Sequence, residues 1–414
     1  MPLLPSTTDD ALFDNLLPGD IHRYARISKA AHSAVSSYIR RRFRIQDVLG
    51  KYFTEREILE FRRLQYYTGM FISGSTALQF FERTRYQESD LDVYVEHRYR
   101  RYVAAFMLKA GYAYIEAPEG WPLAGDEGPP ESLEAILERV PDEEDGEGGG
   151  DDLFAGAFHP AAPTWYFGAA ILLNFEKKNP HRKIQGITCH RAPLQKVLHF
   201  HSTCVMNVIT HDRAYAVFPR ATFDEHKTMI NLPASARRGS HRAREELALE
   251  KYKQRGWEII SSISPTEFQD PKFMFSHGTR RLGDSKCWTI PLNPKLGLPE
   301  RCMETSSWAL HYDENLQPKI SFAIFSWKRL KFSHLFVDEL LRRYIEYVAD
   351  EIERNKFIMP QTDDGADMEF RARVNRYLDL FYNANSTLSI GTTETEMDFE
   401  FQERVVMYQH TGLT

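Results

Sequence analysis

The sequence predicts an α/β protein of the α+β type, in which a mixed-sheet lobe flanked by helices precedes a mostly helical second lobe. Three observations favour this class. The chain has 414 residues, 42% hydrophobic and 27% charged, as in a globular protein long enough for two domains. Short strand-like segments alternate with helical ones between residues 50 and 192. Beyond residue 192, apolar residues recur mainly at helical spacing.

The composition excludes several other classes. The 23 Gly and 21 Pro are too few for a collagen-like or low-complexity chain. No apolar run approaches the roughly 18 residues that a membrane-spanning helix needs. The first 20 residues lack a basic and then apolar signal pattern, and four cysteines are too few for a disulfide scaffold. We therefore expect a cytoplasmic or nuclear protein with no membrane partner.

The charge is distributed unevenly along the chain. Residues 126–152 contain twelve acids against Arg139 alone, a net charge of −11, so the overall −6 leaves +5 for the remainder. A mildly basic remainder is compatible with a phosphate-bearing ligand without requiring one. The acid- and glycine-rich stretch cannot bury enough apolar surface to offset its ordering entropy. We therefore expect residues 118–160 to be a disordered acidic insertion within the sheet lobe.

Four segments follow from this pattern: an N-terminal helical segment (1–49), the sheet lobe (50–192), a mainly helical lobe (193–360) and an acidic C-terminal segment (361–414). The N-terminal segment has helical periodicity from residue 14 to 45. It ends in the basic cluster Arg40, Arg41, Arg42 and Arg44. We interpret this cluster, like Arg83 and Arg85, as solvated surface charge rather than as a phosphate-binding patch.

The sheet lobe begins with a clear helix signal. Thr54 and Glu57 form a capping-box pair, and the helix should end at Gly69, a favourable left-handed position. The expected elements after it are strand 70–72, a helix after Gly74 and Ser75, strand 91–95, helix 98–110 and strand 112–115. Beyond the insertion, strands 165–175 and 183–189 are expected to pair through a turn at Asn179-Pro180.

In the remaining chain we expect helices at roughly 193–209, 240–255, 333–355 and 368–382, and strands at 257–263 and 320–325. The stripe of apolar residues along 333–355 is interpreted as core packing rather than as a ligand-binding motif.

Two short motifs combine to suggest chemistry. Gly74 and Ser75 lie where a strand turns directly into a helix, so backbone amides and a hydroxyl can meet an anion there. Asp90 and Asp92 lie two residues apart on the next strand, so both carboxylates project from one face. Two hard oxygen ligands suit Mg²⁺ or Mn²⁺, which complete their shells with water and substrate phosphates. An anion cradle beside a metal site is what nucleotidyl transfer requires.

This arrangement resembles the Gly-Ser and Asp-x-Asp signature of the nucleotidyltransferase fold superfamily, which includes poly(A) and CCA-adding polymerases, polymerase β and cyclic GMP-AMP synthase-like enzymes. The segments SGSTALQFF, SDLDVYV and FHSTCVMNVIT are also similar to proteins of basidiomycete fungi. The resemblance implies that Asp90 and Asp92 are catalytic metal ligands and that Gly74 and Ser75 bind the nucleotide. It further implies a nucleoside triphosphate as substrate and an acceptor hydroxyl on RNA, protein or a small molecule.

The sequence departs from the family at the third carboxylate. Gln185 falls where the family has an acid on a later strand, and Glu176 on the preceding strand is a possible substitute. Two alternatives therefore stay open: a Mg²⁺-dependent nucleotidyltransferase, or a catalytically degenerate fold that binds nucleotide, RNA or protein. A third alternative is an adaptor that uses the N-terminal helices.

Overall fold

The computed structural model describes residues 6–86, 89–116, 132–138, 169–231, 240–337, 339–355 and 362–384. The chain divides into two compact units, Met1–Arg343 and Tyr344–Thr414. Helices and a large mixed sheet occur together in the first unit, which confirms the predicted α+β class. No helix among the described residues is both long enough and apolar enough to cross a membrane.

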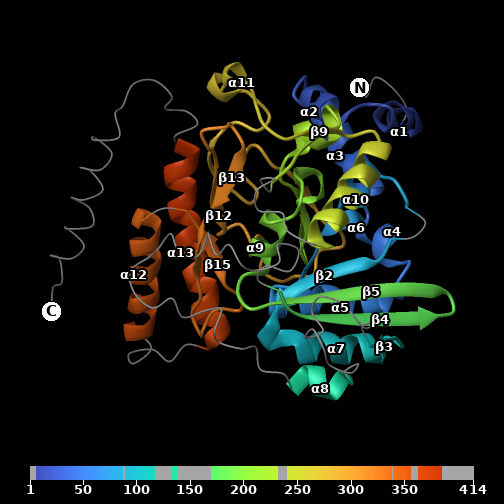
Figure 1. The fold of residues 1–414 in the computed structure, drawn as a ribbon, viewed down its shortest axis with the longest axis vertical. Coiled ribbons are helices and arrows are strands. Elements are labelled where there is room, and N and C mark those ends of the chain that lie inside the picture. Colours follow the sequence, from blue (N-terminus) through green and yellow to red (C-terminus); the bar gives the residue numbers. More distant parts are fainter. Residues whose placement is uncertain are drawn as a thin grey trace. The chain divides into compact units, whose positions relative to one another are not determined.

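An eight-stranded mixed sheet forms the centre of the first unit, in the order β11-β7-β6-β1-β2-β5-β4-β3 (Figure 1). Its strands are β1 (Phe71–Ile72), β2 (Leu91–Glu96), β3 (Ala113–Ile115), β4 (Ala169–Lys178), β5 (His181–Cys189), β6 (Asn207–Ile209), β7 (Arg213–Ala216) and β11 (Trp288–Pro291). Neighbouring strands are antiparallel apart from the parallel pair β2 and β5.

Three smaller sheets pair the remaining strands of the unit. They are β10-β12-β13 (Gly278–Arg281, Ser307–Tyr312, Pro318–Ser321), β14-β15 (Ala323–Phe325, His334–Phe336) and β8-β9 (Lys227–Met229, Glu258–Ile260).

The helices of the first unit flank these sheets (Figure 1). They are α1 (Ser6–Asp14), α2 (Pro18–Ala25), α3 (Lys29–Arg42), α4 (Ile45–Leu49), α5 (Glu55–Thr68), α6 (Gly74–Glu82), α7 (Arg100–Lys109), α8 (Leu133–Glu138), α9 (Pro193–Leu198), α10 (Ser240–Gln254) and α11 (Pro265–Gln269). In Figure 1, α6 and α10 lie on one side of β2, whereas α7 and α8 lie on the other side of the β2-β5-β4 strands.

Two hydrophobic clusters cover the two faces of the central sheet. Because side chains alternate along a strand, Val93 packs in one cluster and the adjacent Tyr94 in the other. Helices α1 to α4 contribute to the first cluster, where the rings of Phe43 and Phe80 lie 5.7 Å apart. Helices α1 to α4 therefore share a core with the sheet.

Several local predictions are confirmed. Thr54 and Glu57 form the capping box of α5, and Gly69 ends that helix in the left-handed conformation at φ +66°. Strands β4 and β5 pair antiparallel on either side of Asn179-Pro180. Each of these signals depends on residues close together in sequence.

Other predictions differ from the structure. The helix expected over 193–209 ends at Leu198, and β6 pairs with β1 and β7. The helix expected over 333–355 is β15 followed by α12 (Glu339–Asn355). A short apolar run fits both the helical period of about 3.6 residues and the strand period of two. Whether it forms a helix or a strand therefore depends on which strands are available to pair with it. Because β6, β7 and β11 complete the central sheet, the boundary expected at residue 192 runs through the sheet, and residues 193–337 contain many strands.

Part of the segment that was expected to be disordered is helical. Residues 132–138 include α8, whose Ile136 packs in the first hydrophobic cluster. The prediction of disorder was based on the average composition of the whole segment, and it was wrong for this short amphipathic helix. The rest of the predicted insertion, 118–131 and 139–160, lies outside the described residues, as does the C-terminal stretch 385–414.

The second unit contains most of α12 together with α13 (Asp363–Ala384), which is longer than the helix expected over 368–382. The rings of Tyr344 and Tyr377 stack with centroids 4.5 Å apart. Arg373 donates hydrogen bonds to Glu351 and to Glu369. A stacked ring pair and a shared guanidinium therefore connect the two helices.

Candidate functional site

The turn from β1 into α6 brings backbone donors to one end of the sheet. Ser73, which precedes the helix, donates its Oγ–H to the carbonyl of Asn207 at 2.6 Å and so does not cap α6. Its backbone N–H donates to the carbonyl of Asp92 at 3.2 Å. The first turn of α6 therefore has no side-chain cap from Ser73. The amides of a helix's first turn lack intrahelical partners and are the donors that anions bind at such positions. Ser75 lies half-buried in this turn.

Gly74 and Asp92 lie in close contact. Gly74 has φ +67°, and a Cβ atom at this position would lie 2.8 Å from Asp92 Oδ2. A side chain at position 74 is thus disfavoured both by the backbone conformation and by the carboxylate. The structure therefore brings together the two motifs that the sequence analysis selected.

Hydrogen bonds fix the segment that leads into β2. Thr76 Oγ1 donates to the carbonyl of Asp90 at 2.8 Å, and Tyr52 Oη donates to the carbonyl of Ser89 at 2.8 Å. Asp90 is exposed, whereas Asp92 is partly buried. Asp90 immediately precedes β2, and Asp92 is the second residue of that strand. Hydrogen bonds from Thr76 on α6 and from Tyr52, between α4 and α5, hold the backbone at Asp90 and Ser89.

A polar row crosses the sheet beside Asp92. Asp92 pairs with Gln185 on β5, and Gln185 pairs with Asn174 on β4. Gln185 Nε2 donates to Asn174 Oδ1 at 3.1 Å. Glu176 pairs instead with Lys183, and its carboxylate contacts His181 Nε2 at 2.7 Å. The residue beside Asp92 is therefore an amide, and Glu176 belongs to a different row.

The electrostatics of the two aspartates differ. Burial raises the pKa of Asp92 to about 7; the charge of Asp90 adds to this effect, and Lys251 on α10 opposes it. Asp90 is exposed as a residue, but partial desolvation of its carboxylate also raises its pKa, while Lys183, His181 and Lys251 lower it. A cation bound at Asp92 would favour the ionised carboxylate that burial disfavours.

The carboxylates fit one hard cation better than two. Asp90 and Asp92 supply oxygen ligands of the kind Mg²⁺ prefers, and water or phosphate oxygens can fill the remaining positions. Among the described residues, no group of three or more His, Cys, Asp or Glu side chains could hold a metal ion. A second cation beside Asp92 would meet the neutral amide of Gln185.

Sequence reasoning missed Asn174 and Lys183 as neighbours of the aspartates, and it favoured a solvated face for the helix that carries Lys251. Lys183 and Gln185 are two residues apart on β5, just as Asp90 and Asp92 are two residues apart at the start of β2. The period of two along a strand could therefore have placed Lys183 on the same face of the sheet as Gln185. Lys251 gave no local signal, because α10 follows the aspartates by about 160 residues.

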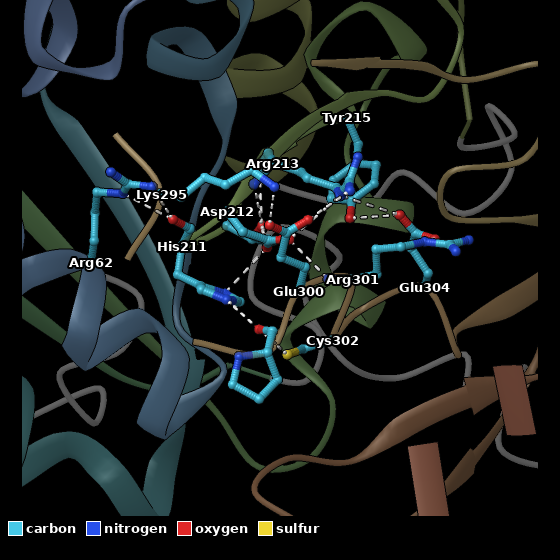
Figure 2. Close-up of polar contacts among 12 residues, drawn as sticks. Arg62, His211, Asp212, Arg213, Tyr215, Lys295, Glu300, Arg301, Cys302 and Glu304 are labelled. Atoms are coloured by element: carbon cyan, nitrogen blue, oxygen red, sulfur yellow. Dashed lines mark hydrogen bonds and ion pairs between the residues drawn. The ribbon is translucent and has the colours of Figure 1, made fainter. Parts of the chain in front are cut away.

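A second polar cluster connects α5, the β6–β7 turn and the segment 292–304 (Figure 2). Arg62 is 1% exposed and donates three hydrogen bonds of 2.7–2.8 Å to the carbonyls of His211 and Pro294. Arg213 contacts Glu300 at 3.1 Å, and Tyr215 Oη donates to Glu304 at 3.0 Å.

The polar groups of this cluster bind one another. The cavity beside them has a volume of only about 10 Å³, room for no more than one water molecule. Figure 2 shows the side chains directed toward one another in a network of hydrogen bonds and ion pairs. We therefore interpret the cluster as a structural network rather than as a binding site.

Comparisons of the chain with models of protein families, with curated proteins and with solved structures gave no match. A functional assignment therefore depends on the residues and their geometry.

Proposed function

We propose that this protein binds a nucleoside triphosphate together with Mg²⁺ at Asp90 and Asp92 and transfers the nucleotidyl group to an acceptor hydroxyl. The observation that carries the proposal is the contact between Gly74, at the start of α6, and the Asp92 carboxylate on β2. It brings a helix N-terminus, which favours phosphate, next to a carboxylate that favours a divalent cation.

In this proposal the chain's own groups have separate roles. Asp90 and Asp92 hold the cation, which lessens the charge on the triphosphate. The amides at Gly74 and the hydroxyl of Ser75 orient the phosphates. The acceptor hydroxyl releases its proton to solvent as its oxygen forms a bond to the α-phosphorus. The bond from that phosphorus to the bridging oxygen of the β-phosphate breaks, and pyrophosphate leaves with that electron pair. The acceptor, whether RNA, protein or a small molecule, would be a cytoplasmic or nuclear one.

Calorimetric titration of ATP and GTP with and without Mg²⁺ tests this proposal without knowledge of the acceptor. We expect the wild type to bind nucleotide in a Mg²⁺-dependent way and the Asp90→Asn/Asp92→Asn variant to lose that dependence. Asp350→Asn, an exposed site in the second unit, is the control for the charge change. Equal Mg²⁺-dependent binding in all three proteins, or none in the folded wild type, would refute the proposal.

A second candidate is a degenerate nucleotidyltransferase fold that binds nucleotide, RNA or protein without catalysis. It is favoured by Gln185, which pairs with Asp92 where the family resemblance implies a third acid. The variant Gln185→Glu separates the two candidates, and Asn174 can turn its amide to donate to the new carboxylate. A gain in Mg²⁺-dependent pyrophosphate release supports the enzyme, whereas nucleotide binding with no turnover in either protein supports the binding module.

A further inference from the structure

A basic cavity of about 320 Å³ is lined by the end of α3, by α4 and by α6 with the segment that follows it. Its size is at the small end of the range of about 300–1,000 Å³ for ligand pockets. Six cations and one carboxylate, Asp47, contribute to the lining. The cations are Arg41, Arg42, Arg44, Lys51, Arg83 and Arg85. Apart from Arg40, the arginines that the sequence analysis assigned to solvated surface therefore line one pocket, and all of those lining it except Arg83 are exposed, as expected.

Half of these cations already have carboxylate partners. Arg41 pairs with Asp10, and Asp14 pairs with both Arg42 and Arg83. These ion pairs connect α1 to the pocket wall and account for part of its charge. They give the wall a fixed shape before any ligand arrives.

The other half are not neutralised. Arg44, Lys51 and Arg85 form no ion pair with a carboxylate in the part of the chain that the structure describes. Burial lowers the pKa of Lys51, and the positive charges of Arg85 and Arg182 lower it further. Repulsion among cations at a partly buried site is a cost that a bound anion would relieve.

We propose that this pocket is a binding site for a small polyphosphate anion, separate from the carboxylates of Asp90 and Asp92. Arginine forks and a lysine ammonium match the oxygens of linked phosphate groups, each forming charge-assisted hydrogen bonds. The cavity has a volume of only about 320 Å³, and the whole chain has a net charge of −6, so an extended nucleic acid fits it less well than a compact ligand. The site needs no divalent metal, since its charge comes from side chains.

The probe for this site is inorganic tripolyphosphate, titrated by calorimetry into the full chain at low ionic strength with EDTA present. We expect one saturable site whose affinity falls as salt is added. The variant Lys51→Gln/Arg85→Gln should bind about 100-fold more weakly, because removing each charge-assisted hydrogen bond to the phosphates weakens binding about tenfold. The matched control is Arg26→Gln/Lys29→Gln, which removes the same two residue types from exposed positions outside the pocket.

Thermal unfolding shows whether each variant folds, so that a loss of binding can be distinguished from a loss of structure. Without ligand, the pocket variant should be at least as stable as the wild type, because it removes like charges that repel one another. With tripolyphosphate, the wild type and the control should gain more in Tm than the pocket variant. Absence of saturable binding in the wild type, or equal affinity in the pocket and control variants, would overturn the proposal.

Competition identifies the source of the phosphates. If metal-free ATP displaces tripolyphosphate and loses affinity in the pocket variant, the ligand is the triphosphate of a nucleotide. If ATP with Mg²⁺ and tripolyphosphate bind together, the pocket takes a separate polyphosphate. Tripolyphosphate binding should persist in Asp90→Asn/Asp92→Asn, so failure of the proposed function and failure of this inference give different results.

Discussion

A methyl group added at position 74 tests the contact between α6 and β2 directly. In Gly74→Ala the new Cβ would lie 2.8 Å from Asp92 Oδ2 and 3.8 Å from its Cγ. Non-bonded carbon and oxygen atoms do not stay that close, so one group must move. The backbone of Asp92 is held in the ladder with β5 and by the N–H of Ser73. We therefore expect the Asp92 side chain to leave its position.

The magnitude has two parts. Left-handed φ costs a non-glycine residue about 1 kcal/mol or more. Moving Asp92 away from its preferred rotamer costs about 0.5–1.5 kcal/mol. Gly74→Ala should therefore lower the free energy of unfolding by about 2 kcal/mol. Gly297→Ala is the matched control, because Gly297 has φ +68° and no atom lies within 4 Å of its added Cβ. It should lose only the first part, about 1 kcal/mol.

Urea unfolding of both variants in EDTA, followed by tryptophan fluorescence, measures the stability difference. Mg²⁺-dependent ATP binding, measured by calorimetry, reports the position of Asp92. We expect Gly74→Ala to lose more stability and to bind ATP more weakly, while Gly297→Ala keeps wild-type binding. Equal destabilisation of the two variants, or wild-type Mg²⁺ dependence in Gly74→Ala, would refute the close contact.

Two further predictions concern charge and burial. The pKa of Asp92 is raised to about 7, so its ionisation penalises the folded state: the metal-free protein should lose stability as pH rises from about 4 through 7. Asp92→Asn should flatten that dependence in urea titrations at pH 5 and 8, and parallel curves for the two proteins would contradict it. Arg62→Met should cost about 3–5 kcal/mol, because the buried guanidinium and its three hydrogen bonds to the carbonyls of His211 and Pro294 are removed. The exposed neighbour Arg63→Met should cost less than about 0.5 kcal/mol, and a similar cost at both positions would show that the Arg62 hydrogen bonds contribute little.

The sequence predicted those features that depend on neighbouring residues. The α5 capping box needs Thr54 and Glu57 alone, and the end of α5 needs a residue that tolerates positive φ at Gly69. The joint motif of Gly74 and Asp92 was found in the same way, because about fifteen residues of strand, turn and helix separate its parts. Such features are determined by interactions between residues that are close in the sequence, so they can be predicted without knowledge of the tertiary structure.

Features that depend on distant partners were not predicted. The run from Thr203 to Ile209 is buried throughout and carries no clear period, so it was assigned to a helix. It contains β6 because β1 and β7 supply hydrogen-bond partners on both sides. The arginines at the end of α3 and those after α6 were predicted to be surface charges, and most of them are exposed, but the cavity that they share was not predicted. Because the two groups of arginines are far apart in the sequence, no local pattern indicates that they line one cavity.

Helix α6 connects the two anion sites proposed for this protein. Its first residue, Gly74, contacts the carboxylate of Asp92, whereas Thr76 and Gln79 line the basic cavity. Thr76 also donates to the carbonyl of Asp90, and Gln79 Oε1 accepts from the backbone N–H of Tyr86. A polyphosphate in the cavity would thus stabilise the same helix and loop that hold the aspartates. Thermodynamic linkage is reciprocal. If tripolyphosphate changes the affinity of the protein for Mg²⁺ and nucleotide by some factor, Mg²⁺ and nucleotide must change the affinity for tripolyphosphate by the same factor.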